Sequence, residues 1–293
     1  MTSVGVIAHE GKTLGNGLGE LRAALADLGI ADPPWRQVAK SKHAPKQLRR
    51  MLRDGVERVL VWGGDGTVRR CIDTIVEEGS DAELGILPAG TANLLAKGLD
   101  IPIDLHGALD VALHGHVKPI DVGVINGERF AVMGGTGFDA LMIRDADDAK
   151  DRLGRFAYIR AGARNLDGPG AEATIEVDGR TWYEGHASCV LVGNLGRILG
   201  GVSAFPDARP DDGVLDIGVV TAEQRREWLR VGLRAMTGHI DSSPLVEVTQ
   251  GKKMKIRLDR KLPWELDGGD RPEVKKLTVS VLPGRLPVCV PAS

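Results

Sequence analysis

The first part of the chain alternates short apolar runs with segments that have the periodicity of amphipathic helices. Apolar runs occupy residues 4–9, 35–38, 58–62 and 83–88, and a helical pattern follows each of them. Strands joined by helices lie parallel within one sheet, because each helix carries the chain back to the end where the previous strand began. The sequence therefore predicts an α/β domain with a parallel sheet over residues 1–121.

From about residue 122 the pattern changes to that of antiparallel strands. "VINGERFAV" contains an Asn-Gly pair and "ATIEVDGRTWYEG" an Asp-Gly pair, and both dipeptides favour two-residue hairpin turns. Further strand patterns follow, while helical patterns near 151–166 and 222–238 interrupt them. We expect a second, mainly antiparallel β domain over residues 122–282, although one discontinuous domain with a large insertion fits a chain of 293 residues equally well.

Composition and charge narrow the class of protein. Apolar residues make up 42% of the chain and charged residues 27%, as in ordinary globular proteins, and the net charge of -2 argues against binding of nucleic acid. Residues 35–53 nevertheless contain no acid and several basic side chains, which fit either a solvated helix face or a surface that attracts anions or lipid headgroups. A second basic run covers residues 252–261.

Three widely spaced cysteines, Cys71, Cys189 and Cys289, form no CxxC pair. We expect them to be buried in a reduced, cytosolic protein rather than to bind metal or act in catalysis. The sequence shows no secretion signal and no apolar run long enough to span a bilayer. The expectation is therefore a cytoplasmic protein without a membrane span.

The segment "WGGDGTV" follows a strand pattern and opens a helical one. Glycine N–H groups can approach phosphate oxygens closely because no Cβ intervenes, and the start of a helix adds partial positive charge. The carboxylate of Asp65 would repel a bare phosphate, so it is expected there if Mg²⁺ bridges it to a polyphosphate or if it positions a hydroxyl group. The alternative is that Asp65 only caps the helix that begins near Thr67.

A second strand, small-residue turn and helix follow in "GILPAGTANLLAKGL". Thr91 offers a hydroxyl group and Asn93 an amide at the start of this helix. Ligands of open parallel sheets bind at the carboxyl ends of the strands. The two loops are therefore expected to face one nucleotide.

Several motifs in a fixed order resemble the diacylglycerol-kinase-like lipid kinases, a group that includes bacterial diacylglycerol kinases and the sphingosine and ceramide kinases. The motifs are "GGDGT", "PAGTANLLA", "IDVGVINGERF", "GGTGFDA", "LGRFAYI", "VGNLGRILGG", "PDARPDDGVLDI" and "LDGG". "GGDGT" alone is shared with NAD kinases. The resemblance implies an ATP-binding α/β domain, completed by the last strands at about 283–293, and a β-sandwich-like domain for the lipid substrate.

The resemblance also implies roles for particular residues. Thr91 and the first loop would hold the triphosphate, and the residues of that loop are Gly63, Gly64, Asp65, Gly66 and Thr67. Asp121 would join Asp65 in a water-linked Mg²⁺ network.

The second domain would hold the lipid and a further metal ion. Asp139 would lie near the acyl acceptor, and the helical segment at 151–166 would line the lipid pocket. A structural Mg²⁺ site would consist of Asp212 and the backbone carbonyls of Arg209 and Val214, although "DDG" fits a simple turn equally well.

The sequence departs from the family pattern at three places. His9 and Lys12 occupy the neighbourhood of the usual Asn-Pro strand end, so Lys12 is a candidate phosphate ligand. Arg70 replaces an acid after "GGDGTV". Gly269 stands where the family has the glutamate proposed as general base. The candidates for that role here are, in order of preference, Asp270, Glu265 and Asp65.

The resulting hypothesis is an ATP- and Mg²⁺-dependent lipid kinase that phosphorylates diacylglycerol at the inner face of the membrane, with only transient, peripheral attachment to it. A sphingoid base or ceramide is an alternative acceptor. The competing functions are an NAD kinase and a regulator that binds nucleotide or lipid without turnover, the latter motivated by Gly269. A homodimer is compatible with the sequence.

Overall fold

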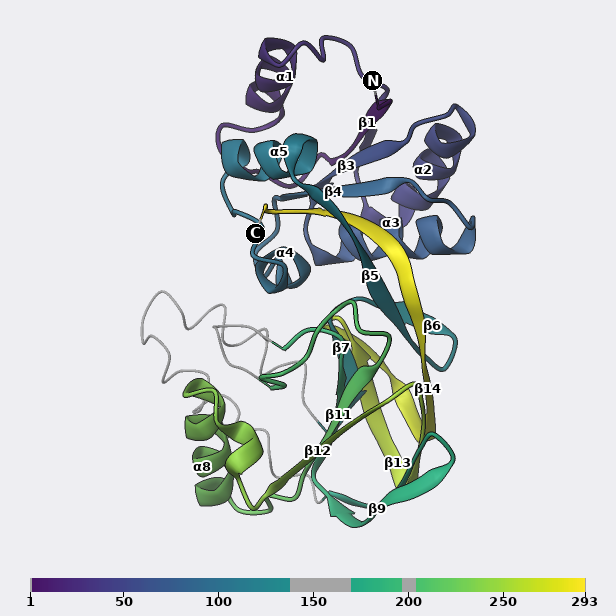
Figure 1. The fold of residues 1–293 in the computed structure, drawn as a ribbon, viewed down its shortest axis with the longest axis vertical. Coiled ribbons are helices and arrows are strands. Elements are labelled where there is room, and N and C mark those ends of the chain that lie inside the picture. The colour runs from purple at the N-terminus through teal and green to yellow at the C-terminus, as the bar shows by residue number, and fades with distance from the viewer. Residues whose placement is uncertain (1, 138–169, 197–203, 293) are drawn as a thin grey trace. The chain divides into compact units, whose positions relative to one another are not determined.

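The computed structural model describes residues 2–137, 170–196 and 204–292, so Asp139 and the segment 151–166 lie outside the described residues. The chain divides into two compact units (Figure 1). The first comprises Met1–Ile120 with Gly284–Ser293, and the second comprises Asp121–Pro283. Strands β5 (His116–Ile125) and β14 (Gly269–Val290) belong partly to each unit.

The first unit is built on a parallel sheet, as predicted, and its strand order is β2-β1-β3-β4. The last part of β14 extends this sheet, because Val288 pairs with Leu84 in parallel register. The other strands of this sheet are β1 (Val4–His9), β2 (Trp35–Val38), β3 (Arg58–Gly63) and β4 (Glu83–Pro88). The central residues of β1, β3 and β4 are buried, as in a sheet that is covered on both faces, whereas those of the edge strand β2 are not.

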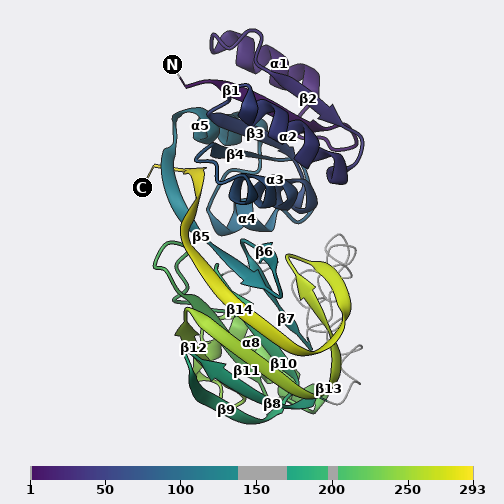
Figure 2. The same ribbon diagram turned by 90° about the vertical axis from the view of Figure 1, so that its right-hand side faces the viewer.

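Helices cover both faces of this sheet, with α1 and α5 on one side and α2 and α3 on the other (Figure 2). The helices of the unit are α1 (Leu18–Asp27), the 3-10 turn η1 (Ser41–His43), α2 (Ala44–Arg53), α3 (Asp65–Glu77), α4 (Leu94–Gly98) and α5 (Leu105–His114). Pro45 lies in the first turn of α2, where its missing N–H costs no hydrogen bond. Helix α3 begins two residues before the predicted start at Thr67. Helix α5 was not predicted from the sequence, although Asp104 caps it by accepting the N–H of Gly107 at 2.8 Å.

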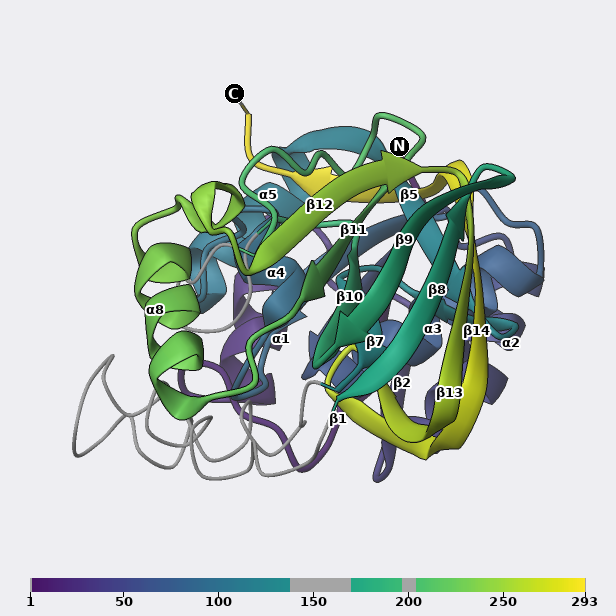
Figure 3. The same cartoon turned by 90° about the horizontal axis from the view of Figure 1, so that it is seen from below.

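The second unit is mainly antiparallel, as predicted (Figure 3). Its strands run in the order β12-β11-β10-β7-β13-β14, with β8 paired with β13, β9 paired with β8, and β6 paired with β5. The strand bounds are β6 (Glu128–Phe130), β7 (Met133–Thr136), β8 (Ala171–Val177), β9 (Arg180–Ala187), β10 (Cys189–Gly193), β11 (Leu215–Val220), β12 (Val246–Gly251) and β13 (Lys253–Leu266). Helix α8 (Arg225–Met236) and the 3-10 turn η3 (Ile240–Ser242) lie between β11 and β12 in the chain.

Both predicted hairpin turns are present, because Asn126-Gly127 and Asp178-Gly179 adopt positive φ angles at both positions. A third turn of the same kind, Asp267-Gly268, joins β13 to β14. The Asp267 carboxylate accepts three backbone N–H groups at 3.0–3.2 Å, which fixes the tip of this hairpin against the start of β7. These donors are Ala131, Val132 and Met133.

All three cysteines are buried, as expected. Burial raises the pKa of Cys71 to about 12, so its nucleophilic thiolate form is strongly disfavoured at neutral pH. Over residues 2–137, 170–196 and 204–292, no helix has the length and hydrophobicity that a membrane crossing requires.

Candidate active site

The first glycine-rich loop leaves β3 and enters α3 at the carboxyl end of the parallel sheet. A Cβ added at Gly63 would lie 2.7 Å from the Cβ of Thr67, and one added at Gly64 would lie 3.0 Å from the Cα of Gly90. The first distance is shorter than real Cβ contacts, and the second is so tight that the backbone of Gly90 would have to shift. The glycines are therefore needed so that this loop can pack against its own helix and against the loop that follows β4.

Asp65 joins the first loop to the second. Its Oδ2 accepts the N–H of Asn93 at 2.9 Å, and its Oδ1 accepts the N–H of Leu94 at 2.6 Å. These two N–H groups begin α4, where no carbonyl of the helix itself can accept them. The alternative interpretation, that Asp65 only caps its own helix, is wrong, because α3 has no side-chain cap and the carboxylate instead caps α4.

Burial and hydrogen bonding act in opposite directions on Asp65. Burial raises the pKa of its carboxyl group, whereas the N–H groups of Leu94 and Asn93 and the charge of Lys97 lower it. The net pKa is raised above the ordinary value for aspartate. Because each oxygen accepts a backbone N–H, the carboxylate is fixed in orientation before any ligand arrives.

Asn93 shapes the second loop from within. It adopts the left-handed conformation, with φ of 49°, and its Oδ1 accepts the N–H of Gly90 at 2.9 Å. Its Nδ2 donates to the carbonyls of Pro88 at 3.1 Å and Gly90 at 2.8 Å. The side-chain amide that was predicted to face a nucleotide is thus engaged inside the loop, while Thr91 is exposed at its tip.

Two further contacts lie at the same edge of the sheet. The carbonyl of Lys12, after β1, accepts the indole N–H of Trp62 at 3.0 Å, next to the first loop. The Oγ of Ser41, after β2, lies 2.9 Å from the Oγ1 of Thr67. The sequence analysis missed Ser41, although its position after a parallel strand was a signal, because all four strands end at this edge.

Asp121 belongs to the second unit, where it is held by a loop that precedes β11. Its Oδ2 accepts the N–H of Gly213 at 2.7 Å, and its own N–H donates to the carbonyl of Pro210 at 2.6 Å. The buried Asn194, which sequence reasoning also missed, donates from Nδ2 to the Asp121 carbonyl at 2.8 Å. Asp121 and the "PDDG" turn are therefore one hydrogen-bonded assembly.

The turn itself concentrates negative charge. The Oδ1 of Asp212 accepts the N–H of Val214 at 3.1 Å, and Gly213 has a φ of 78°, as in the simple turn that was the alternative reading. The pKa of Asp216 is raised to about 6, chiefly by burial and further by the carboxylates of Asp212 and Asp207, although a hydrogen bond from Gln250 lowers it. Oxygen donors with excess negative charge are the ligands that Mg²⁺ prefers.

The predicted ligands of a cation at this turn are the carboxylate of Asp212 and the backbone carbonyls of Arg209 and Val214. Within the part of the chain that the structure describes, no group of three or more His, Cys, Asp or Glu side chains is arranged to hold a metal ion. A cation here would therefore depend on backbone carbonyls as well as on the carboxylate, which is a donor set that Mg²⁺ accepts.

The candidates for general base lie near the hairpin of β13 and β14. Glu265 and Asp270 are register partners across this hairpin, with Glu265 buried and Asp270 exposed. Glu265 is also the register partner of Gly135 in β7, and its charge contributes to the raised pKa of Cys189. Gly269, at the position of the family glutamate, pairs with Leu266 next to the turn.

We predict that Asn93→Ala destabilises the protein by about 2–3 kcal/mol, because it removes three internal hydrogen bonds and places an alanine in the left-handed region. Asn93→Gly removes the same bonds without the backbone strain, so it should cost about 1 kcal/mol less. Urea unfolding of the three proteins measures both differences. Equal stability of the wild type and Asn93→Ala would contradict the role assigned to this side chain.

We predict that Asp216→Asn stabilises the protein above pH 6 in metal-free buffer. The folded pKa of about 6 exceeds the usual 3.8, so the wild type loses stability as the pH rises between these values and no further above them. After allowance for solvent screening, the gain should reach about 1–2 kcal/mol near pH 7 and vanish near pH 4. The side-chain oxygen of the introduced asparagine can still accept the hydrogen bond from Gln250 Nε2. Thermal unfolding from pH 4 to 8 tests this, and a gain that does not change with pH would refute it.

Comparisons with known proteins agree with the two-unit architecture. Residues 8–125 match the diacylglycerol kinase catalytic domain, and residues 132–290 match the YegS C-terminal NAD kinase beta sandwich-like domain. The chain is 30% identical over 230 residues to a diacylglycerol kinase of Bacillus subtilis, covering 77% of this chain and 74% of that protein. It is 30% identical over 297 residues to a probable lipid kinase YegS-like of Pseudomonas aeruginosa, covering 98% and 94%.

Solved structures show the same fold. A putative diacylglycerol kinase from Bacillus anthracis superposes with a TM-score of 0.82 at 24% identity, covering 99% of this chain and 97% of that one. An NAD kinase from Archaeoglobus fulgidus in complex with ATP gives a TM-score of 0.54 at 9% identity, covering 97% and 92%. The second unit is therefore β-sandwich-like, as expected. With both of its units matched by the family models, this chain belongs to the diacylglycerol kinase and YegS-like family of lipid kinases.

Proposed function

We propose that this protein transfers the γ-phosphate of ATP to the hydroxyl group of a membrane lipid, with diacylglycerol as the acceptor and phosphatidic acid as the product. The observation that carries the proposal is the junction of two glycine-rich loops through Asp65 at the carboxyl edge of the parallel sheet. This junction brings together two strand-to-helix turns that resemble phosphate-binding loops, in a chain whose relatives are named lipid kinases.

The chain's own residues would hold and orient the nucleotide. The N–H groups at the start of α3 suit the phosphates, because Gly64 and Gly66 present backbone without a Cβ. Thr67, Thr91 and Lys12 would add contacts from the neighbouring loops. When bound, Mg²⁺ supplies charge neutralisation on the phosphates, and Asp65 and Asp121 are the proposed residues for its water-linked network.

Asp270 is the proposed general base in place of the missing glutamate. It is exposed, whereas Glu265 is buried and both oxygens of Asp65 accept backbone N–H groups. A positioned base contributes roughly 10²- to 10⁴-fold, whereas orientation and electrostatics supply most of the acceleration of phosphoryl transfer. Loss of the family glutamate is therefore compatible with a slower enzyme.

The proposed enzyme works in the cytoplasm and reaches its substrate peripherally. A diacylglycerol or other single-hydroxyl lipid stays in the bilayer, so the protein must come to the membrane surface. A sphingoid base or ceramide presents the same hydroxyl group on an apolar body and is the second candidate acceptor. The only observation that favours a regulator that binds nucleotide or lipid without turnover is Gly269, which stands in place of the family glutamate.

The direct test is transfer of radiolabel from ATP to a lipid extract dispersed in detergent, with mass spectrometry of the product. We expect a labelled phospholipid that requires Mg²⁺ and is diminished at least tenfold in Asp65→Asn. The absence of any labelled lipid, together with thermal stabilisation by ATP, would instead support the non-catalytic regulator. Formation of NADP from NAD and ATP would support the NAD kinase.

We predict that Gly269→Glu raises the turnover number by about 10-fold or more, because it restores a carboxylate at the family position. The site can accept it with a shift of a few tenths of an ångström in the Arg271 guanidinium, since an added Cβ would lie 3.1 Å from its Nη1 and 3.4 Å from the Leu266 carbonyl oxygen. Gly269→Gln is the matched control, with equal size and no basic group. Identical turnover of both variants would show that no base is missing from this position.

A further inference from the structure

Helix α8 has one face against its own unit and one face in solvent. Val231 and Ala235 are buried, at 4% and 5% exposure. Leu229 and Leu233 are each 45% exposed, although both are large apolar side chains. At 100° per residue, the two leucines point almost directly away from the buried pair. Nearly half of the surface of each leucine therefore faces solvent instead of the core of the unit.

The pairing of these leucines sets them apart from the other exposed apolar residues. Among the described residues, the remaining large exposed hydrophobic side chains are Leu28, Ile103 and Val117, which lie on three separate segments. Single exposed residues of this kind are common in globular proteins. Two leucines one helical turn apart on the same outward face form a continuous apolar strip.

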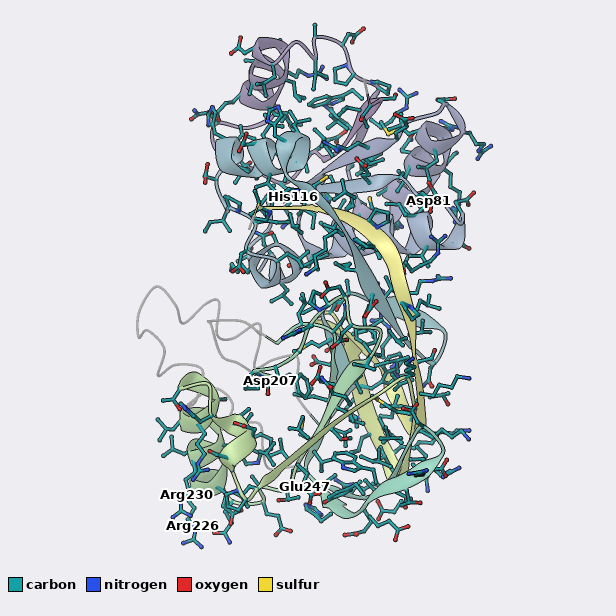
Figure 4. The ribbon with its side chains drawn as sticks, viewed as in Figure 1. Asp81, His116, Asp207, Arg226, Arg230 and Glu247 are labelled. Carbon is teal, nitrogen blue, oxygen red and sulfur yellow. The ribbon has the colours of Figure 1, made fainter. Side chains whose placement is uncertain are left out.

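Arginines flank this strip on the same outward face. Arg226 and Arg230 are exposed and extend from α8 away from the sheet (Figure 4). The only acid in the helix, Glu227, accepts the N–H groups of Glu223 and Gln224 at its N-terminus. The outward face is thus apolar and cationic in a protein whose net charge is -2.

We propose that the outward face of α8, formed by Arg226, Leu229, Arg230 and Leu233, docks onto anionic phospholipid bilayers. The inference rests on the proposed function, which requires the protein to reach a lipid within a membrane. Leucines at this spacing enter the boundary between headgroups and acyl chains, while arginines contact the phosphates. A protein partner would need acidic side chains placed opposite the arginines. Every anionic bilayer already presents negatively charged headgroups to them.

Sedimentation with phosphatidylglycerol–phosphatidylcholine vesicles, without ATP or diacylglycerol, tests the docking apart from catalysis. Each basic residue near an anionic surface contributes roughly fivefold to binding, so Arg226→Glu with Arg230→Glu should weaken it by about 25-fold or more. Leu229→Gln with Leu233→Gln, which preserves helix propensity, should weaken it by about tenfold. Vesicles of phosphatidylcholine alone should bind the wild type weakly.

The matched control is Lys46→Glu with Arg50→Glu in α2. These residues are also exposed and one helical turn apart, so the change in charge is the same. We expect this variant to bind vesicles much better than the α8 charge variant. Equal losses in the two variants would overturn the proposal, because charge alone would then account for binding.

A water-soluble, short-chain diacylglycerol separates docking from chemistry. The α8 variants should phosphorylate it at the wild-type rate and fail only with vesicle-embedded substrate. If the wild type binds vesicles through α8 but phosphorylates neither substrate, the docking surface stands and the proposed function fails. If the leucine variant instead turns a dimer into a monomer in sedimentation velocity and leaves vesicle binding unchanged, the strip is a contact between copies of the chain.

Discussion

The hydrogen bonds of Asp65 to the start of α4 are the constraint on which the candidate site depends. The carboxylate lies in the first glycine-rich loop and accepts N–H groups of the second, 28 and 29 residues away in the chain. Glycines at positions 64 and 90 permit this approach, since a Cβ at Gly90 would lie 2.4 Å from the Cα of Gly64. Two turns on neighbouring strands are thereby joined into one hydrogen-bonded surface.

In the second unit, too, aspartate carboxylates accept backbone N–H groups from loops that are distant in the chain. Asp121 holds the "PDDG" turn through Gly213, and Asp267 holds the start of β7 through three N–H groups. In both cases a carboxylate orders a loop that is distant in sequence. Such hydrogen bonds to a charged acceptor are about twice as strong as neutral ones, so a few of them can order several loops. The acidic motif residues are thus structural as well as candidates for chemistry.

Local signals account for what the sequence predicted well. The parallel sheet follows from the alternation of strand and helix patterns, and the turns at Asn126 and Asp178 follow from dipeptides that tolerate positive φ. The partner of Asp65 could not be predicted, because the contact joins residues far apart in the chain and depends on the packing of two loops. The same reason explains why Asn194, whose side chain donates to the carbonyl of Asp121, was missed. The motif order in the chain nevertheless indicated the family correctly.

Amide hydrogen exchange at Asn93 and Leu94 tests most directly whether Asp65 builds the site. These two amides should exchange slowly in the wild type and about 10- to 100-fold faster in Asp65→Ala, while amides in the core of β3 are unchanged. In the same samples, ATP with Mg²⁺ should protect the amides of Gly64 and Gly66 in the wild type alone. Unchanged exchange at Asn93 and Leu94 in the variant, or equal protection by the nucleotide in both proteins, would contradict this account.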